Sequence, residues 1–309
     1  MLKQKDILEN DMKQLVVISG KGGTGKTVIT AAFASLAENK VMADCDVDAA
    51  DLHLLLEPKI LEKHQFTGGK TAVINKAKCD HCGTCIVKCR FDAISEESYT
   101  VDPISCEGCG VCFHICPKMA IKMKDNLSGE WFISETKYGP FVYAKLGIAE
   151  ENSGKLVTVV RQNAKLIAER KNCDLIIIDG PPGIGCPVIS SITGTDVVLI
   201  VTEPTLSGIH DMVRVIELAQ HFKIKTYVII NKYDLNTEMT EKIEKYCQKN
   251  KINLAGKIIY DSIVIESMVN KKIVVEYSNG EITQQIKNVW EILQNETLSK
   301  RGSKKNETI

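Results

Sequence analysis

The chain has 309 residues, of which 44% are hydrophobic and 25% charged, so it can bury a sizeable core in one large domain or two smaller ones. Lysine plus arginine balance aspartate plus glutamate at 39 each, which gives no overall field favouring nucleic acid or an anionic membrane as a partner. The charged start MLKQKDILENDMKQ has no apolar signal region and no apolar run could span a bilayer, so we expect a cytoplasmic protein without nucleic-acid or membrane partners.

Short apolar runs alternate with helical patterns along the chain. The runs are typical of buried parallel strands, and they cover residues 15–19, 41–46, 174–179, 196–202 and 226–231. Apolar residues at helical spacing predict helices over residues 27–40, 155–172 and 209–222, with a shorter helix over 49–58 that Pro58 ends. Strands that alternate with helices predict an α/β fold with a doubly wound parallel sheet.

This alternation breaks between residues 59 and 127, which predicts an inserted domain. The host domain then consists of residues 1–58 and 128–309. The insertion contains an internal repeat, because the eleven residues from Cys79 (CDHCGTCIVKC) match the eleven from Cys106 (CEGCGVCFHIC). Duplication of a small metal-binding unit explains such a repeat most simply.

A glycine-rich loop, SGKGGTGKT, stands between the first strand and the first helix. It fits the phosphate-loop pattern G-x-x-x-x-G-K-[ST], in which backbone N–H groups and the helix N-terminus hold phosphate oxygens. Lys26 is expected to neutralise the β- and γ-phosphates, and the Thr27 hydroxyl to bind Mg²⁺. The predicted ATP-binding residues of the loop are Gly20, Lys21, Gly22, Gly23, Thr24, Gly25, Lys26 and Thr27.

Further polar residues follow the carboxyl ends of other strands. Asp179 ends the apolar run DLIIID and is expected to hold Mg²⁺ through water. Asn231, in the short motif NKYD, is expected near the nucleotide base, although an asparagine here is also typical of a turn. Four carboxylates follow the second strand: Asp44, Asp46, Asp48 and Asp51. At least one of them is expected to face the metal or the attacking water, although each alone is also typical of a loop or a helix cap.

The loop has a second lysine, and with it the stretch resembles the deviant Walker A motif K-G-G-x-G-K-T of the MinD/ParA/Mrp and nitrogenase iron-protein ATPases. The resemblance extends over ADCD, DGPPG and VTEPTLSGIHD, and so over nearly all the chain outside the insertion. It implies a Mg²⁺-dependent ATPase that forms a homodimer, or a heterodimer with a close relative, when ATP binds. In this resemblance Lys21 reaches the partner subunit's nucleotide, Asp46 positions the hydrolytic water and Asn231 contacts adenine. Otherwise Lys21 is a solvated loop cation.

The repeated cysteines follow the spacing C-x₂-C-x₂-C-x₃-C twice. This spacing resembles bacterial ferredoxins with two [4Fe–4S] clusters, in which the fourth cysteine of each run binds the other run's cluster. The resemblance implies one cluster on Cys79, Cys82, Cys85 and Cys116, and a second on Cys106, Cys109, Cys112 and Cys89. Structural zinc is the alternative, although zinc sites normally separate their cysteine pairs more widely.

Outside the insertion, Cys186 lies seven residues after Asp179. The nitrogenase iron protein has a cluster-binding cysteine at this spacing, but it needs a second cysteine upstream that this chain lacks. Whether Cys186 binds a cluster stays open.

Together these features resemble MinD-superfamily ATPases with an inserted ferredoxin domain, some of which belong to the orange-protein complex of anaerobes. The first hypothesis is ATP hydrolysis in a dimer coupled to electron transfer through the clusters, and complete ligation by eight cysteines favours such stable redox centres. The second is a cluster or metal-cofactor assembly ATPase. The third is a MinD-like positioning ATPase, in which residues 282–300 would form a membrane-binding amphipathic helix. The sequence does not identify the redox or assembly partner.

Overall fold

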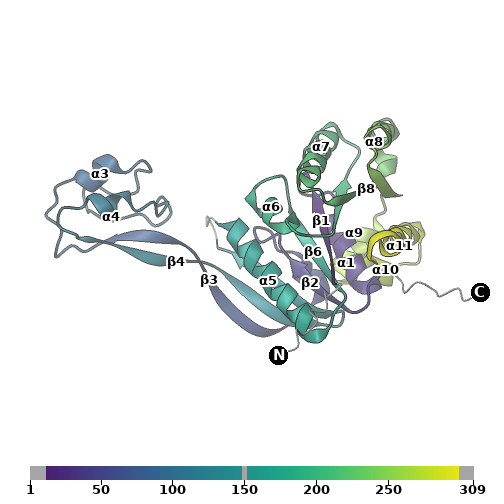
Figure 1. Ribbon diagram of the computed structural model, residues 1–309, viewed down its shortest axis with the longest axis horizontal. Helices are drawn as coiled ribbons and strands as arrows, with labels where there is room; N and C mark the ends of the chain where they lie inside the picture. The colour runs from purple at the N-terminus through teal and green to yellow at the C-terminus, as the bar shows by residue number, and fades with distance from the viewer. Residues whose placement is uncertain (1–11, 148–151, 299–309) are drawn as a thin grey trace, which may run out of the picture.

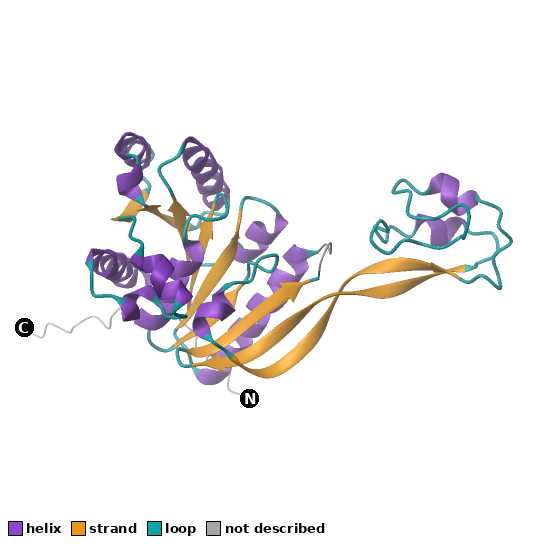
Figure 2. Cartoon of the chain, turned by 180° about the vertical axis from the view of Figure 1, so that it is seen from behind, coloured by secondary structure: helices purple, strands orange, loops and turns teal. Residues whose placement is uncertain are grey.

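The computed structural model of the chain describes residues 12–147 and 152–298. Figure 1 shows a body of strands and helices, from which a long ribbon of two strands leads to a small module that contains α3 and α4. Figure 2 shows from behind that the ribbon is a continuation of the body's sheet. The arm, meaning the ribbon and its module, therefore grows out of the sheet rather than out of a flexible loop.

One nine-stranded sheet forms the centre of the body, in the order β3-β4-β5-β2-β6-β1-β7-β8-β9. The strands are β1 (Lys13–Ser19), β2 (Lys40–Asp44), β3 (Lys59–Ile74), β4 (Ile121–Thr136), β5 (Gly139–Leu146), β6 (Leu175–Pro182), β7 (Val197–Thr202), β8 (Lys225–Asn231) and β9 (Asn253–Ile258). All neighbours from β5 to β9 in this order run parallel, whereas β3, β4 and β5 pair antiparallel. The central strands are buried on both faces, which explains their continuous apolar sequences.

Helices cover both faces of this sheet. One face packs against α1 (Lys26–Leu36), α2 (Leu52–Leu56), α9 (Ile263–Val269), α10 (Val274–Tyr277) and α11 (Glu281–Leu293). The other packs against α5 (Ser153–Lys171), α6 (Cys186–Ile192), α7 (Leu206–His221) and α8 (Thr237–Lys249). Short 3₁₀ and π turns lie at Tyr233–Leu235 and Gln294–Leu298. The predicted parallel, doubly wound α/β architecture is thus confirmed for the body.

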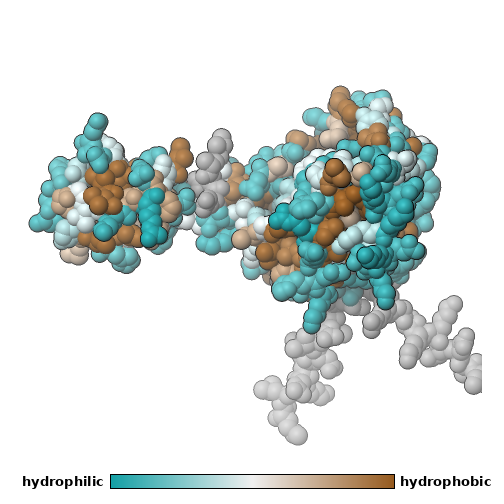
Figure 3. Space-filling model, turned by 90° about the horizontal axis from the view of Figure 1, so that it is seen from above, coloured by the Kyte–Doolittle hydropathy of each residue, from teal (hydrophilic) through white to brown (hydrophobic). Residues whose placement is uncertain are grey.

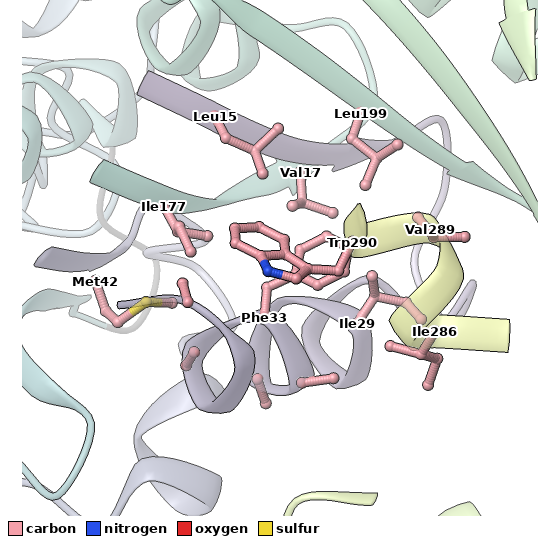
Figure 4. Close-up of a cluster of buried hydrophobic side chains, with 14 of the residues drawn as sticks. Leu15, Val17, Ile29, Phe33, Met42, Ile177, Leu199, Ile286, Val289 and Trp290 are labelled. Atoms are coloured by element: carbon pink, nitrogen blue, oxygen red, sulfur yellow. The ribbon is translucent and has the colours of Figure 1, made fainter. Parts of the chain in front are cut away.

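The last helix, α11, packs into the core with its apolar face. Ile286 and Trp290 are buried, and the Trp290 ring lies 5.0 Å from the ring of Phe33 on α1 (Figure 4). Burying such a side chain contributes about 1.5–3 kcal/mol, so this face stabilises the body. The amphipathic pattern in this helix is therefore explained by packing on the domain, without a membrane. No described helix has the length and apolar character needed to cross a membrane.

The ribbon is formed by β3 and β4, which pair from Lys59 opposite Glu135 to Ile74 opposite Ile121. Most side chains of β3 are exposed, so its sequence lacks the alternation of apolar and polar residues that predicts a strand. The predicted end of the insertion, residue 127, lies inside β4, because this strand serves both the arm and the main sheet.

The module at the end of the ribbon has a very small core. Its short helices are α3 (Thr84–Lys88) and α4 (Val111–Ile115), and Ala72, Cys85, Ile94 and Ile121 form its packed apolar cluster. Ala93 and Ala120 are also buried. Four of the remaining cysteines, Cys89, Cys106, Cys112 and Cys116, pack against this core. A core of this size rarely stabilises a fold alone, and small domains commonly need a metal or disulfides in addition. The module's own identity as a ferredoxin-like domain stays a prediction.

Candidate nucleotide site and cysteine module

The phosphate loop lies between β1 and α1, as predicted. Gly23 and Gly25 have φ angles of +79° and +90°, which favour glycine, and a Cβ on Gly25 would lie only 2.4 Å from Nδ2 of Asn231. That same Nδ2 donates a hydrogen bond of 2.8 Å to the carbonyl oxygen of Thr24. Asn231, at the end of β8, therefore holds the loop from a distant strand. Its predicted contact with adenine stays a prediction.

Lys26 is buried at the centre of the site between two carboxylates. Its Nζ lies 3.0 Å from Oδ1 of Asp179 and 3.2 Å from Oδ2 of Asp46. Burial alone would lower the pKa of Lys26, but the charges of Asp179, Asp46 and Asp44 outweigh it and raise this pKa. The ammonium is therefore charged. Without nucleotide, it compensates the negative charges of these carboxylates.

Two of these carboxyl groups have raised pKa values. Burial, and secondly the charge of Asp179, raises the pKa of Asp44 well above its usual range. Burial also raises the pKa of Asp46, and Lys26 only partly opposes this effect. Perturbed carboxylates in a cleft are typical of functional sites.

Asp44 has a structural role that the sequence left open. Its carboxylate accepts backbone N–H hydrogen bonds from Asp46, at 3.1 Å, and from Leu52, at 3.2 Å. It therefore connects the first turn of α2 with the loop that contains Asp46. This outcome is closest to the helix-cap alternative that the sequence allowed.

The site has donors that fit a magnesium ion. Asp179 is 1% exposed, and its Oδ1 accepts hydrogen bonds from Lys26 and from the Thr30 hydroxyl. Its Oδ2 is buried and has no hydrogen-bond partner among the described residues. A buried carboxylate oxygen without a partner is costly, and a hydrated Mg²⁺ would satisfy it. Thr27 lines the cleft above the phosphate loop, as its predicted role as a Mg²⁺ ligand requires, whereas Asp179 is not on that lining.

The cleft above the loop has a volume of about 580 Å³. That is within the range of ligand pockets that bury a molecule of drug size. Asp48 and Asp51 lie on its lining, as do Asn231 and the segment from Ile258 to Asp261 after β9. The predicted loop, Asp46 and Asn231 thus come together around one cavity, whereas Asp234 instead accepts the backbone N–H of Tyr260.

Lys21 points away from this cavity and is held within its own subunit. Its Nζ lies 2.6 Å from Oε1 of Glu203, which follows β7, and it also donates to Ser207 at 3.1 Å. Lys232 approaches the other oxygen of Glu203 at 3.4 Å. Burial opposes ionisation of Glu203, but its contacts with Lys21 and Lys232 prevail and lower its pKa. Sequence reasoning missed Glu203, because nothing near it in the chain indicates a partner for Lys21.

The module has two cavities, and each is lined by four cysteines. Cys79, Cys82, Cys85 and Cys116 line one of them, together with Pro117. Cys89, Cys106, Cys109 and Cys112 line the other. These are the two sets that the crossed arrangement predicts, with the fourth cysteine of each run placed beside the other run. The backbone N–H of Ala120 also donates to the Cys116 sulfur at 3.3 Å.

No three His, Cys, Asp or Glu side chains within residues 12–147 and 152–298 converge on a point that would hold one metal ion. A [4Fe–4S] cluster is bound at its iron corners, so its thiolates surround it instead of meeting at a point. Four thiols around each cavity are the donors that this cluster requires, and the cysteine sets fit it. Binding itself stays a prediction.

Cys186 is remote from this module. It is the first residue of α6, exposed, and close to Gly154 at the start of α5. Cys45, Cys173 and Cys247 are buried in the body.

Comparisons with known proteins agree with the fold and the loop. The chain is 33% identical to the uncharacterized protein MJ0578 of Methanocaldococcus jannaschii over 287 residues, which are 91% of this chain and 96% of that protein. It is 26% identical to MJ0579 of the same organism over 275 residues, which are 87% of this chain and 94% of that protein. Over most of their lengths, these two relatives and this chain therefore share one architecture.

Among solved structures, the cell division ATPase MinD of Pyrococcus furiosus is similar at a TM-score of 0.56 and 16% identity, covering 92% of this chain and 98% of MinD. MinD of Pyrococcus horikoshii, solved with Mg-ADP, is similar at 0.56 and 18% identity, covering 91% and 96%. At these identities the likeness is one of fold. The sequence itself matches the family described as the CobQ/CobB/MinD/ParA nucleotide binding domain over residues 15–274. Strand, phosphate loop and matched sequence agree, and the chain belongs to this nucleotide-binding family.

Proposed function

We propose that this protein is an ATPase that hydrolyses ATP in a nucleotide-dependent dimer and couples it to electron transfer through two [4Fe–4S] clusters. The observation that carries the proposal is the pair of four-cysteine cavities on an arm that is continuous with the ATPase sheet. The arm would be an inserted ferredoxin-like domain, residues 59–127, within an ATPase of residues 1–58 and 128–309. The clusters, when bound, would supply one-electron transfer.

In the nucleotide site, this chain's residues would bind the phosphates, neutralise their charge and orient the attacking water. The backbone N–H groups of Gly20–Thr27 would hold the phosphates, and Lys26 would move its charge from Asp46 and Asp179 to the β- and γ-phosphates. Thr27 and, through water, Asp179 would hold Mg²⁺. The carboxylate of Asp46, freed from Lys26, would then orient the attacking water and accept its proton.

Backbone contacts support a route from this site to the arm. Asp44 joins the Asp46 loop to α2, and α2 leads directly into β3. On the other side of the loop, the carbonyl of Val47 accepts the N–H of Leu146 at the end of β5, the strand that pairs with β4. A movement of the loop that contains Asp46 would therefore reach both strands of the ribbon, β3 through α2 and β4 through β5.

Double substitutions of cysteine test the clusters and their crossed arrangement. If Cys79 and Cys116 serve one cluster, Cys79→Ser/Cys116→Ser should lower iron from about eight to about four atoms per chain and leave the other cluster intact. The matched variant Cys79→Ser/Cys89→Ser has one change in each set and should damage both clusters. Iron analysis with EPR spectroscopy distinguishes them. Equal loss in the two variants would contradict the crossed arrangement, and Cys186→Ser is the control that should keep about eight irons.

Loss of Lys21 should prevent dimer formation without preventing ATP binding. Lys21→Ala removes the charge proposed to reach the partner's nucleotide, so we expect a protein that binds ATP but remains monomeric and turns over slowly. Light scattering with ATP bound, together with turnover, measures this. Glu203→Gln is the complementary variant, because it removes the carboxylate that holds Lys21 at 2.6 Å and should let dimers form at lower protein concentration. ATP-dependent dimers of normal stability in Lys21→Ala would eliminate the trans role.

The redox potential separates electron transfer from the second candidate, an iron–sulfur cluster or metal-cofactor assembly ATPase. If ATP binds one redox state better, linkage requires it to shift the potential by the same free energy. A coupling of about 1–3 kcal/mol corresponds to about 40–130 mV for a one-electron couple. Potentiometry with and without a non-hydrolysable ATP analogue measures the shift. An unmoved potential, together with transfer of intact clusters to an apo-protein, would favour assembly.

The third candidate is a positioning ATPase, and the similar solved structures favour it by their names. They include MinD, named a cell division ATPase in one organism and a septum site-determining protein in another. The packing of α11 argues against the particular mechanism in which this helix binds a membrane, because Ile282, Ile286 and Trp290 are already buried. Nothing in positioning requires eight cysteines on an arm, so we rank it below the two iron–sulfur functions.

A further inference from the structure

An open hollow lies on the module beside one of its two cysteine cavities. It has a volume of about 460 Å³ and is lined by Lys70, Gly108, Gly110, Phe113, His114, Lys122 and Met123. Three of these residues, Gly108, Gly110 and Met123, also line the cavity of Cys89, Cys106, Cys109 and Cys112. These three residues therefore form a wall that separates the hollow from that cavity.

Glycine backbone makes this wall thin. Gly108 has a φ of +63°, and a Cβ there would lie 2.1 Å from the carbonyl oxygen of Lys70. Only glycine lets the loop lie so close to β3. Gly110, with a φ of +75°, likewise presents backbone rather than a side chain. A molecule seated in the hollow would be separated from the cysteine cavity by little more than this backbone and the side chain of Met123.

The hollow is basic. Lys70, His114 and Lys122 line it, and no carboxylate does. Lys122 has no ion-pair partner among the residues that the structure describes, and Lys70 pairs with Asp125 at 4.0 Å. Beside the other cavity, Lys118 pairs with Asp80 at 3.8 Å. Each cysteine cavity has one carboxylate on its lining, Glu107 or Asp80, whereas the hollow has none.

Apolar side chains accompany these charges. Phe113 lines the hollow and is 43% exposed, and Val111, from the same helix, is also 43% exposed. Figure 3 shows apolar side chains on the surface of the module. Surfaces that combine exposed aromatic side chains with charged ones are typical of sites that bind another protein. The overall charge of the chain is zero, so this local basic surface is not part of a general attraction for polyanions.

We propose that this hollow docks an acidic electron-transfer protein, whose carboxylates meet Lys70, Lys122 and His114, and that electrons pass between this partner and the Cys89/Cys106/Cys109/Cys112 site. This inference rests on the proposed electron-transfer function. In one direction a single electron would leave the partner's reduced group, which is oxidised, and a [4Fe–4S] cluster held by these four cysteines would accept it; no bond forms and no proton moves. Steering by opposite charges accelerates such encounters and weakens as salt is added.

The test uses the full chain with its clusters, and an acidic flavodoxin as the probe. We expect binding at low salt that weakens as the salt concentration rises, with Lys70→Glu/Lys122→Glu weakening the affinity by about tenfold or more. Lys76→Glu/Lys88→Glu carries the same charge change on exposed residues outside the hollow and should bind as the wild type does. Lys70→Arg/Lys122→Arg should retain binding. Calorimetry gives the affinity, and stopped-flow spectroscopy gives the rate of electron transfer from the reduced flavodoxin.

Each outcome has a separate meaning. If both charge-reversed variants weaken binding equally, or if the flavodoxin does not bind at low salt, the docking site is wrong, whereas the cysteine variants above still decide the cluster proposal. Equally tight binding of a DNA duplex would also overturn it, because the surface would then recognise any polyanion. If the clusters fail to assemble on the wild-type chain, the electron-transfer function and the docking proposal fail together.

Discussion

Lys26→Ala should abolish ATP hydrolysis and leave the iron content unchanged. The lysine is buried against Asp46 and Asp179, and it is the group expected to neutralise the β- and γ-phosphates, so turnover should fall by at least about 10²-fold. The cysteine cavities lie at the far end of the arm, and iron should stay at about eight atoms per chain. Phosphate release and iron analysis on the same preparation measure the two quantities.

The same substitution should also destabilise the protein without nucleotide. Asp44, Asp46 and Asp179 would lose their shared cation, and breaking a buried ion pair from one side commonly costs about 3–5 kcal/mol of unfolding free energy. Lys40→Met is the matched control, because Lys40 is similarly buried and, among the described residues, its Nζ donates to the carbonyl of Ala37 instead of pairing with a carboxylate. It should lose stability and keep turnover. Loss of iron together with turnover in Lys26→Ala would contradict the separation of the two sites.

Local patterns predicted the body because its strands and helices have strong signals of their own. The apolar runs of β1, β6, β7 and β8 are buried on both faces, and the phosphate loop carries its glycines where positive φ angles and close contacts require them. The resemblance of the cysteine runs to ferredoxins implied the two sets that line the cavities, and cluster binding by them stays a prediction. In each case the information lies within about forty residues of chain.

The ribbon and the position of Lys21 could not be predicted in this way. β3 is exposed along most of its length, so its pairing with β4 has no periodic signal and depends on a partner some sixty residues away in the register. Lys21 is held by Glu203, which only the parallel pairing of β1 with β7 brings near. Without the family resemblance, Asp44 and Asp46 were two of four equivalent carboxylates. In the structure Asp44 accepts two backbone hydrogen bonds, whereas Asp46 pairs with Lys26 and lines the cleft.

Asp46, unlike Asp44, has a carboxylate on the cleft that can act on the attacking water. Asp46→Asn keeps the size of the side chain and removes a proton acceptor, so turnover should fall by about 10²–10⁴-fold while ATP affinity changes little. Asp48→Asn, on an exposed residue of the same loop, is the matched control and should turn over normally. Asp44→Asn should act mainly on stability, because it disturbs the acceptor for the N–H groups of Asp46 and Leu52.

The pH dependence gives an independent measure of the role of Asp46. Burial raises the pKa of Asp46, and only the deprotonated carboxylate can orient water and accept its proton. Turnover of the wild type should therefore decline as the pH falls through this raised pKa, above the range of an ordinary aspartate. In Asp46→Asn the low residual rate should lack this decline, whereas Asp48→Asn should retain it. A wild-type rate and profile in Asp46→Asn would transfer the role to another carboxylate of the cleft, with Asp48 and Asp51 as the remaining candidates on its lining.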